Sequence, residues 1–108
     1  MRRGLIGVLL TVMLTARMGV YRNPVTGYTE TWYNLPMQNV INRAAAQGIV
    51  GDYWERADHM KMYGKYIILA AHESIPIGTV IETSRGTGIV LDRTQADKDV
   101  IDIAVTWR

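Results

Sequence analysis

Two aspartates that interrupt apolar segments are the residues best suited to chemistry. Asp92 follows the apolar run 89–91, and Asp102 stands between Ile101 and Ile103. A carboxylate beside apolar residues is costly unless it is hydrogen-bonded, paired or protonated. Because alternate residues of a strand point to opposite faces, one face would be apolar and the other would carry the Asp102 carboxyl. The chemistry open to such a carboxyl is general acid–base catalysis. The alternative is a solvated aspartate on an amphipathic strand.

His72 and a pair of aromatic residues are further candidates. His72 follows the apolar run 66–71, where a histidine more often lies at a strand end or turn than in a catalytic centre. Trp32 and Tyr33 could stack on the apolar faces of sugar rings or pack against the rest of the domain. The two histidines lack the spacing of metal ligands, so no metal site is expected. The glycines of 86–88 are followed by no helix, so they do not form a nucleotide-binding loop.

The composition is that of one globular domain. The chain has 108 residues, of which 48% are hydrophobic and 20% charged, and this balance excludes wholesale disorder. It contains no cysteine, which excludes disulfide scaffolds, thiolate zinc sites and cysteine nucleophiles. The formal net charge of +2 is small for a dedicated nucleic-acid binder, so no nucleic-acid partner is expected.

The residue pattern predicts a mainly β chain with one helix. Strands are expected at residues 28–33, 66–71, 80–83, 88–91 and 100–105. A short helical insert is expected over about 35–48, with Asn34 as its cap, Pro36 in its first turn and Gly48 at its end. Segment 49–64 is expected to be irregular. Short strands and frequent glycines suggest a small β-barrel, closed or half-closed.

The amino end has two interpretations. Arg2 and Arg3 precede an uncharged apolar run over residues 4–16. A basic start followed by roughly 7–15 apolar residues is typical of a signal peptide. The run is shorter than the about 20 residues of a transmembrane helix, so no stable membrane span is expected. The alternative is that the far end of the run forms the first strand. The chain is therefore divided into segment 1–16, signal-like or a first barrel strand, and a single domain over 17–108.

The order of several motifs resembles that of double-psi β-barrel peptidoglycan enzymes. Segments 70–79 (AAHESIPIGT), 88–93 (GIVLDR) and 101–104 (IDIA) carry the resemblance. They are similar to the three-aspartate (3D) domain, shared with the membrane-bound lytic transglycosylase A family, and to the rare lipoprotein A branch. The match covers about residues 66–107 well and the first half of the chain loosely. It implies a small six-stranded double-psi β-barrel with the short helical insert.

The resemblance also implies a function. Such enzymes are lytic transglycosylases, which cut the β-1,4 bond between N-acetylmuramic acid and N-acetylglucosamine and leave a 1,6-anhydro end. Asp102 falls on the family's general acid/base and Asp92 on a carboxylate beside the cleft. The residues expected to bind substrate are His72, Thr79, Asp58, Trp32 and Tyr33. No cofactor or metal is implied. The partner would be peptidoglycan glycan strands, in a protein that is exported, located in a bacterial cell envelope or associated with a phage.

The sequence departs from the family pattern in the loop between the two aspartates. The family motif Asp-Thr-Gly-Gly is replaced by residues 92–95 (DRTQ), and no glycine occurs from Asp92 to Asp102. Only two of the three family aspartates are present, since the first falls near Ala71. Without glycine the backbone cannot approach a substrate as closely. Two alternatives stay open: a non-catalytic glycan-binding or structural barrel in a phage or cell-envelope assembly, and a small intracellular barrel of unrelated function.

Overall fold

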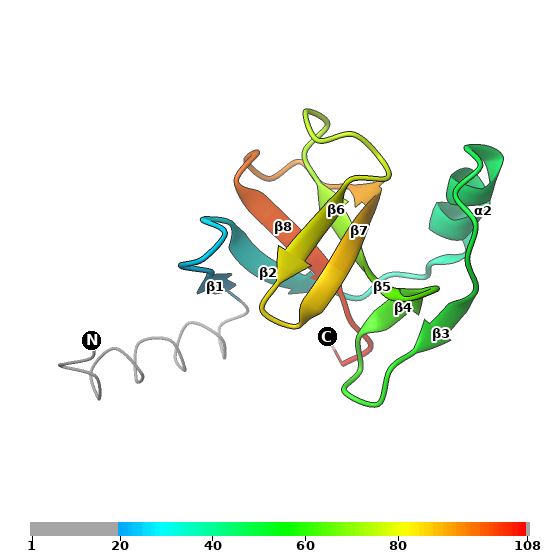
Figure 1. Cartoon of the computed structure of the whole chain (residues 1–108), viewed down its shortest axis with the longest axis horizontal. Coiled ribbons are helices and arrows are strands. Elements are labelled where there is room, and N and C mark those ends of the chain that lie inside the picture. The colour runs from blue at the N-terminus through cyan, green and yellow to red at the C-terminus, as the bar shows by residue number, and fades with distance from the viewer. Residues whose placement is uncertain (1–19, 108) are drawn as a thin grey trace, which may run out of the picture.

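The computed structural model describes residues 20–107, and the expected signal or strand over 1–16 lies outside them. The described part is mainly β with one short helix, as predicted. In chain order its elements are β1 (Val20–Arg22), β2 (Thr29–Tyr33), α2 (Gln38–Ala46), β3 (Tyr53–Glu55), β4 (Lys61–Tyr63), β5 (Tyr66–Ala71), β6 (Val80–Thr83), β7 (Gly86–Arg93) and β8 (Val100–Ala104). Figure 1 shows α2 beside the sheet, away from β1.

The eight strands form one mixed sheet with β5 at its centre. Along its main path the order is β1-β2-β8-β5-β4-β3, and β7 pairs with β5 and with β6. The strand β5 runs parallel to β7 and antiparallel to β8. The chain must therefore cross the end of β5 between Arg93 and Val100 in order to pass from β7 to β8. This crossing places residues far apart in the sequence on either side of one strand.

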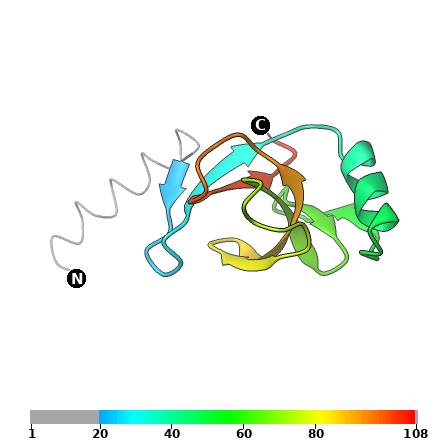
Figure 2. The same cartoon turned by 90° about the horizontal axis from the view of Figure 1, so that it is seen from above.

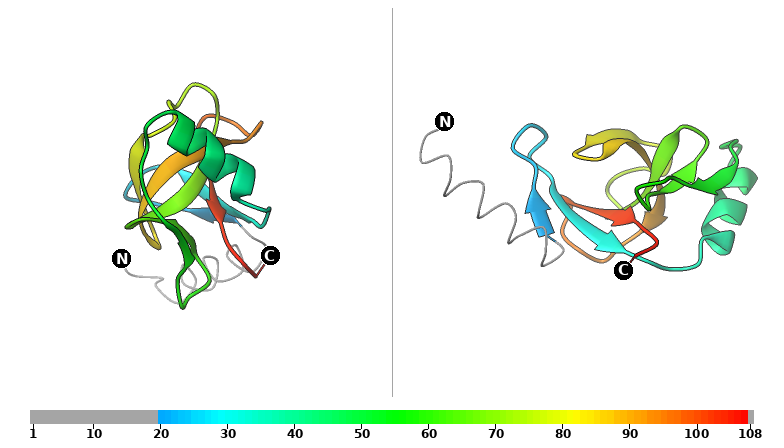
Figure 3. Two further views of the ribbon diagram at one scale, coloured as in Figure 1. Left: turned by 90° about the vertical axis from the view of Figure 1, so that its right-hand side faces the viewer. Right: turned by 90° about the horizontal axis from the view of Figure 1, so that it is seen from below.

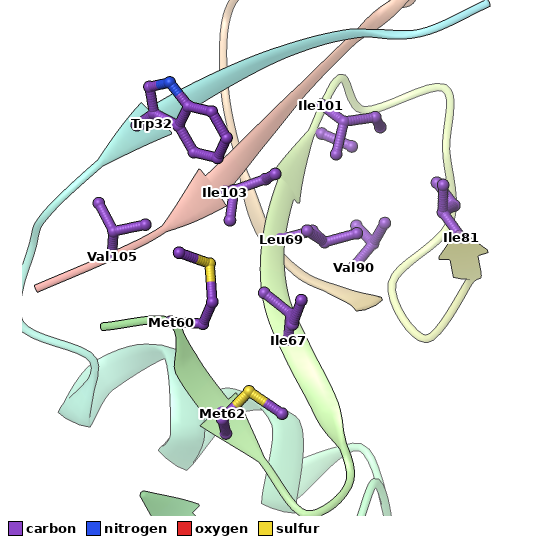
Figure 4. Close-up of a cluster of buried hydrophobic side chains, with 11 residues drawn as sticks. Trp32, Met60, Met62, Ile67, Leu69, Ile81, Val90, Ile101, Ile103 and Val105 are labelled. Atoms are coloured by element: carbon purple, nitrogen blue, oxygen red, sulfur yellow. The ribbon is translucent and has the colours of Figure 1, made fainter. Parts of the chain in front are cut away.

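The sheet curls around one apolar core. Along β2, β5, β7 and β8 the side chains alternate between the two faces of the sheet. Those on one face form the first cluster, which includes Trp32, Leu69, Val90, Ile101 and Ile103. Figure 4 shows these side chains pointing toward one another. The hairpin of β6 and β7 lies across this core from β2 and β8 (Figures 2 and 3). Within residues 20–107 strand pairing does not close the sheet into a ring.

The helix α2 covers the other face of the sheet. Its buried residues Val40 and Ala44 pack with Ile68 and Leu91 in a second cluster. Each of these strand residues neighbours a member of the first cluster in the sequence, so the two clusters lie on opposite faces. The face that α2 partly covers also carries the two predicted aspartates.

Two local predictions are wrong. The helix begins at Gln38, not near residue 35, and Asn34 does not cap it. Asn34 Nδ2 donates instead to Thr106 O, and Asn34 Oδ1 accepts a hydrogen bond from the Lys61 ammonium at 2.6 Å. The segment 49–64 is not irregular, because β3 and β4 form an antiparallel hairpin within it. Polar tertiary contacts compete with local capping, and they decide the conformation here.

Candidate functional site

The two aspartates lie on the same face of the sheet, on either side of β5. Ala70 in β5 is the register partner of Asp92 in β7 and of Asp102 in β8. Register partners in neighbouring strands point to the same face. Ile101 and Ile103 are fully buried in the first cluster, so Asp102 faces away from that core, as predicted. The fold therefore aligns two carboxyls in one row with a small residue between them.

Strand β2 extends this row and holds Asp102. It pairs in parallel with β8, and Thr31 is the register partner of Asp102. The Thr31 hydroxyl donates a hydrogen bond to Asp102 Oδ1 at 2.8 Å. The partly buried Asp102 carboxyl is thus fixed by a neutral donor from a strand that is 71 residues away in the sequence.

Asp92 is held by three donors. The Tyr33 hydroxyl donates to Oδ2 at 3.0 Å, and the Arg93 backbone N–H donates to Oδ1 at 2.8 Å. Arg43 of α2 forms an ion pair with Oδ1 at 3.3 Å. The Asp92 side chain is 15% exposed and Arg43 is 57% exposed, so the pair lies where the helix meets solvent. One charged and two neutral donors therefore fix the position of this carboxyl.

Tyr33 contacts Asp92 and is influenced by the charges of both aspartates. Burial raises the pKa of its hydroxyl above the ordinary value of 10, and the charges of Asp92 and Asp102 raise it further. The hydroxyl therefore keeps its proton and donates a hydrogen bond to Asp92. To reach β7 from β2, the Tyr33 side chain must cross β8 and β5 on this face. Its partner in β8 is Ala104, whose small side chain leaves room for the ring.

An open groove runs along the chain that connects β7 to β8. One hollow, of about 580 Å³, is lined by His72, Glu73, Arg93, Thr94 and Gln95. A second, of about 540 Å³, shares His72 and Gln95 and continues along residues 96–99. The groove lies at the sheet end where β5 and β7 finish. Neither Asp92 nor Asp102 lines either hollow, although Asp92 directly precedes the lining residue Arg93. Its lining includes both acidic and basic side chains.

His72 lies at the junction of the two hollows with its ring orientation fixed. The Ser74 backbone N–H donates to His72 Nδ1 at 3.0 Å, and the Ser74 hydroxyl lies 2.8 Å from the same atom. Because Nδ1 accepts a hydrogen bond, the neutral ring carries its proton on Nε2. Arg93 secures the adjoining backbone by donating to His72 O at 3.0 Å and to Ile75 O.

Three of the residues expected to bind substrate lie elsewhere. Thr79 stabilises the bend before β6, where its hydroxyl donates to Pro76 O at 2.6 Å. Asp58 lies in the turn between β3 and β4, and its hydrogen bonds from Arg56 lower the pKa of the carboxyl. Trp32 is only 6% exposed and packs in the first cluster, on the face opposite Tyr33. Neither face of the Trp32 ring is open for a sugar.

Two residues of the site were not predicted from the sequence. Thr31 stands in a strand rich in β-formers, and nothing in its sequence context indicates a contact with Asp102. The sequence around Arg43 indicates only a solvated helix residue. In the structure its guanidinium contacts the carboxylate of Asp92, 49 residues further along the chain. Both contacts depend on tertiary arrangement: the parallel pairing of β2 with β8 and the packing of α2 beside β7.

Within residues 20–107, no group of three or more His, Asp and Glu side chains could hold a metal ion. No helix in that range is long and apolar enough to cross a membrane. Comparison with protein-family models, with curated proteins and with solved structures gave no match to this chain.

Proposed function

We propose that this protein is a peptidoglycan lytic transglycosylase with Asp102 as its general acid/base. The observation that carries the proposal is the shared alignment of Asp92 and Asp102 beside Ala70 on one sheet face. The groove that begins at Arg93, next to Asp92 in the sequence, supports it, since a glycan strand needs an open and elongated surface. The resemblance of segments 70–79, 88–93 and 101–104 to double-psi β-barrel peptidoglycan enzymes names the substrate.

The proposal includes a six-stranded double-psi β-barrel. Strands β6, β7, β5, β8, β2 and β1 follow one another by pairing, and all of them except β1 contribute side chains to the first core cluster. The chain crosses the end of β5 between β7 and β8, as the connections of such a barrel do. The turn after β6 is joined to β2 by hydrogen bonds from Ser84 to Glu30. Side-chain contacts of this kind would complete the barrel where strand pairing stops.

The proposed reaction needs one carboxyl that both gives and takes a proton. Protonated Asp102 transfers its proton to the glycosidic oxygen, and the bond from that oxygen to C1 of N-acetylmuramic acid breaks. The Asp102 carboxylate then takes the proton of the C6 hydroxyl of the same sugar, whose oxygen attacks C1. The products are a free 4-hydroxyl on N-acetylglucosamine and a 1,6-anhydro end, and no water is consumed.

Asp92 has a different role in this mechanism. Its carboxyl, held in place by Arg43 and Tyr33, would stabilise the positive charge that develops at C1. The two aspartates lie two strand spacings apart, so their Cα atoms are separated by roughly 10 Å. In the proposed mechanism one acid exchanges protons and the other acts through its charge.

Digestion of purified sacculi tests the proposal. The native chain should release muropeptides with 1,6-anhydro ends, identified by mass spectrometry. Asp102→Asn should abolish this release without unfolding the protein, and Glu82→Gln, an exposed carboxyl-to-amide change on β6, should leave it unchanged. Full activity of a folded Asp102→Asn variant would refute the assignment of the acid/base.

A non-catalytic glycan-binding barrel is the second candidate. The groove loop contains no glycine, and the Arg93 guanidinium is engaged with backbone carbonyls at its edge. Such a loop can line a binding surface without approaching a scissile bond. Binding of the native chain to sacculi with no anhydro product would favour this candidate over the enzyme.

A further inference from the structure

The outer edge of β3 is an unpaired strand edge with exposed aromatic residues. Strand β3 ends the main path of the sheet and pairs only with β4 among the described strands. Figure 1 shows it as the last strand below α2. All three of its residues are exposed, including Tyr53 at 36% and Trp54 at 44%. An edge of this kind is a template for pairing with another chain.

The hydrogen-bond register identifies which backbone groups face outward. Asp52 O accepts from Gly64 N at 2.8 Å, and Arg56 N donates to Met60 O at 2.9 Å. In an antiparallel pair, hydrogen-bonded and non-hydrogen-bonded residues alternate. Trp54, midway between Asp52 and Arg56, therefore bonds to β4 as they do. The N–H and C=O groups of Tyr53 and Glu55 point away from β4, to the outer edge.

The sequence around Trp54 is self-complementary in charge. If two copies pair antiparallel about Trp54, Asp52 of each copy lies opposite Arg56 of the other. Tyr53 then lies opposite Glu55, so the outward-facing groups meet as hydrogen-bonded pairs. Moving the two-fold axis to Glu55 would place two carboxylates opposite each other, which is destabilising. Moving it to Tyr53 would remove both opposite-charge pairs.

We infer that two copies of this chain associate through β3, in antiparallel register about Trp54. The interface is isologous, with one tryptophan from each copy at the two-fold axis and an opposite-charge pair on either side. Trp54 is already oriented by its own chain, since Nε1 donates to Gly64 O at 2.7 Å. Arg56 uses Nε and Nη2 for contacts within its chain, which leaves the Nη1 donors for Asp52 of the other copy.

The association is weak and depends on concentration. A short strand pair buries far less than the roughly 1,200–2,000 Å² of a standard stable interface. A dimer of this kind forms where copies are concentrated, as on a shared polymer surface. The inference is independent of the proposed enzymatic function, because none of these residues belongs to the row of aspartates or to the groove.

Sedimentation equilibrium from micromolar to millimolar concentration tests the inference with matched variants. Glu55→Pro removes an outward N–H without removing a bond to β4, and Glu55→Thr keeps that N–H. The native chain and Glu55→Thr should dimerise, whereas Glu55→Pro should stay monomeric. Asp52→Lys should weaken dimerisation about tenfold or more, because it replaces two attractive pairs with two repulsive ones.

Amide hydrogen exchange tests the register in the same samples. On raising the concentration, the Tyr53 and Glu55 amides should become protected, while the Trp54 amide should be protected throughout. A native chain that stays monomeric at millimolar concentration would overturn the inference. Equal dimerisation of Glu55→Pro and Glu55→Thr would overturn it as well, since the outward N–H would then have no part in the contact.

Discussion

Removal of the Glu30 carboxylate should loosen the side-chain closure of the curled sheet. Glu30 is 1% exposed, although sequence reasoning gave it no role. Its Oε2 accepts hydrogen bonds from Asn23 Nδ2 and from the Ser84 backbone N–H, both at 2.9 Å. Its Oε1 accepts a short hydrogen bond from the Ser84 hydroxyl. Glu30 thereby joins β2 to the turn between β6 and β7, although β2 pairs with neither of these two strands.

The expected cost follows from these contacts. Hydrogen bonds to a charged acceptor contribute about 1.5–3 kcal/mol each, but they are not additive within one network. Glu30→Ala also leaves the Asn23 amide, which is itself buried, without this acceptor. Removing the burial cost of the carboxylate offsets part of the loss. We expect Glu30→Ala to lower the free energy of unfolding by about 3 kcal/mol, a large part of the roughly 5–15 kcal/mol of a typical domain.

Urea denaturation followed by tryptophan fluorescence measures this change. Glu30→Gln keeps one acceptor oxygen and should cost less, about 1–2 kcal/mol. Glu82→Ala is the matched control, because it removes an exposed glutamate of the same hairpin that accepts only from Thr87 at 2.8 Å, and it should cost less than about 0.5 kcal/mol. If Glu30→Ala destabilised the protein no more than Glu82→Ala, Glu30 would not hold the hairpin.

Two further changes test the site and the core. The raised pKa of Tyr33 means that its stabilising contribution is complete below pH 10 and lost as the pH rises further, so Tyr33→Phe should flatten the alkaline fall in stability measured by denaturation at several pH values. A Tyr33 that titrated near 10 by ultraviolet absorbance would contradict this. A Cβ on Gly88 would lie 2.6 Å from Leu69 Cδ1, so Gly88→Ala should lower stability by about 1–3 kcal/mol in thermal unfolding. In a Leu69→Ala background the same change should cost less, and additive costs would exclude the overlap as the cause.

Two strands with apolar residues at strand spacing were predictable from sequence. The apolar run 66–71 and the segment 80–83 coincide with β5 and β6. The alternation around Asp102 also predicted its orientation, because a carboxyl between two buried isoleucines has only one other face to occupy. In these segments the period of apolar residues and the tertiary environment agree, so local reasoning was sufficient.

The contact of Thr31 with Asp102 could not be predicted, because it depends on parallel pairing. A parallel neighbour is joined by a long connection, and its register leaves no local signal. Thr31 meets Asp102 only because β2 runs beside β8 in one particular register. The strand β3 was missed for a different reason: its residues are all exposed, so no apolar alternation marks it.

The residue between the two aspartates determines what the site can accommodate. Ala70 is buried, and on this face its methyl group lies between two carboxyls and beneath the path of the Tyr33 side chain. A larger residue would fill that path and separate the Tyr33 hydroxyl from Asp92. Asp92 would then depend on Arg43, whose exposed guanidinium contributes little in the absence of the buried donor. The position of the Asp92 carboxyl thus depends on an alanine whose side chain has no polar atom.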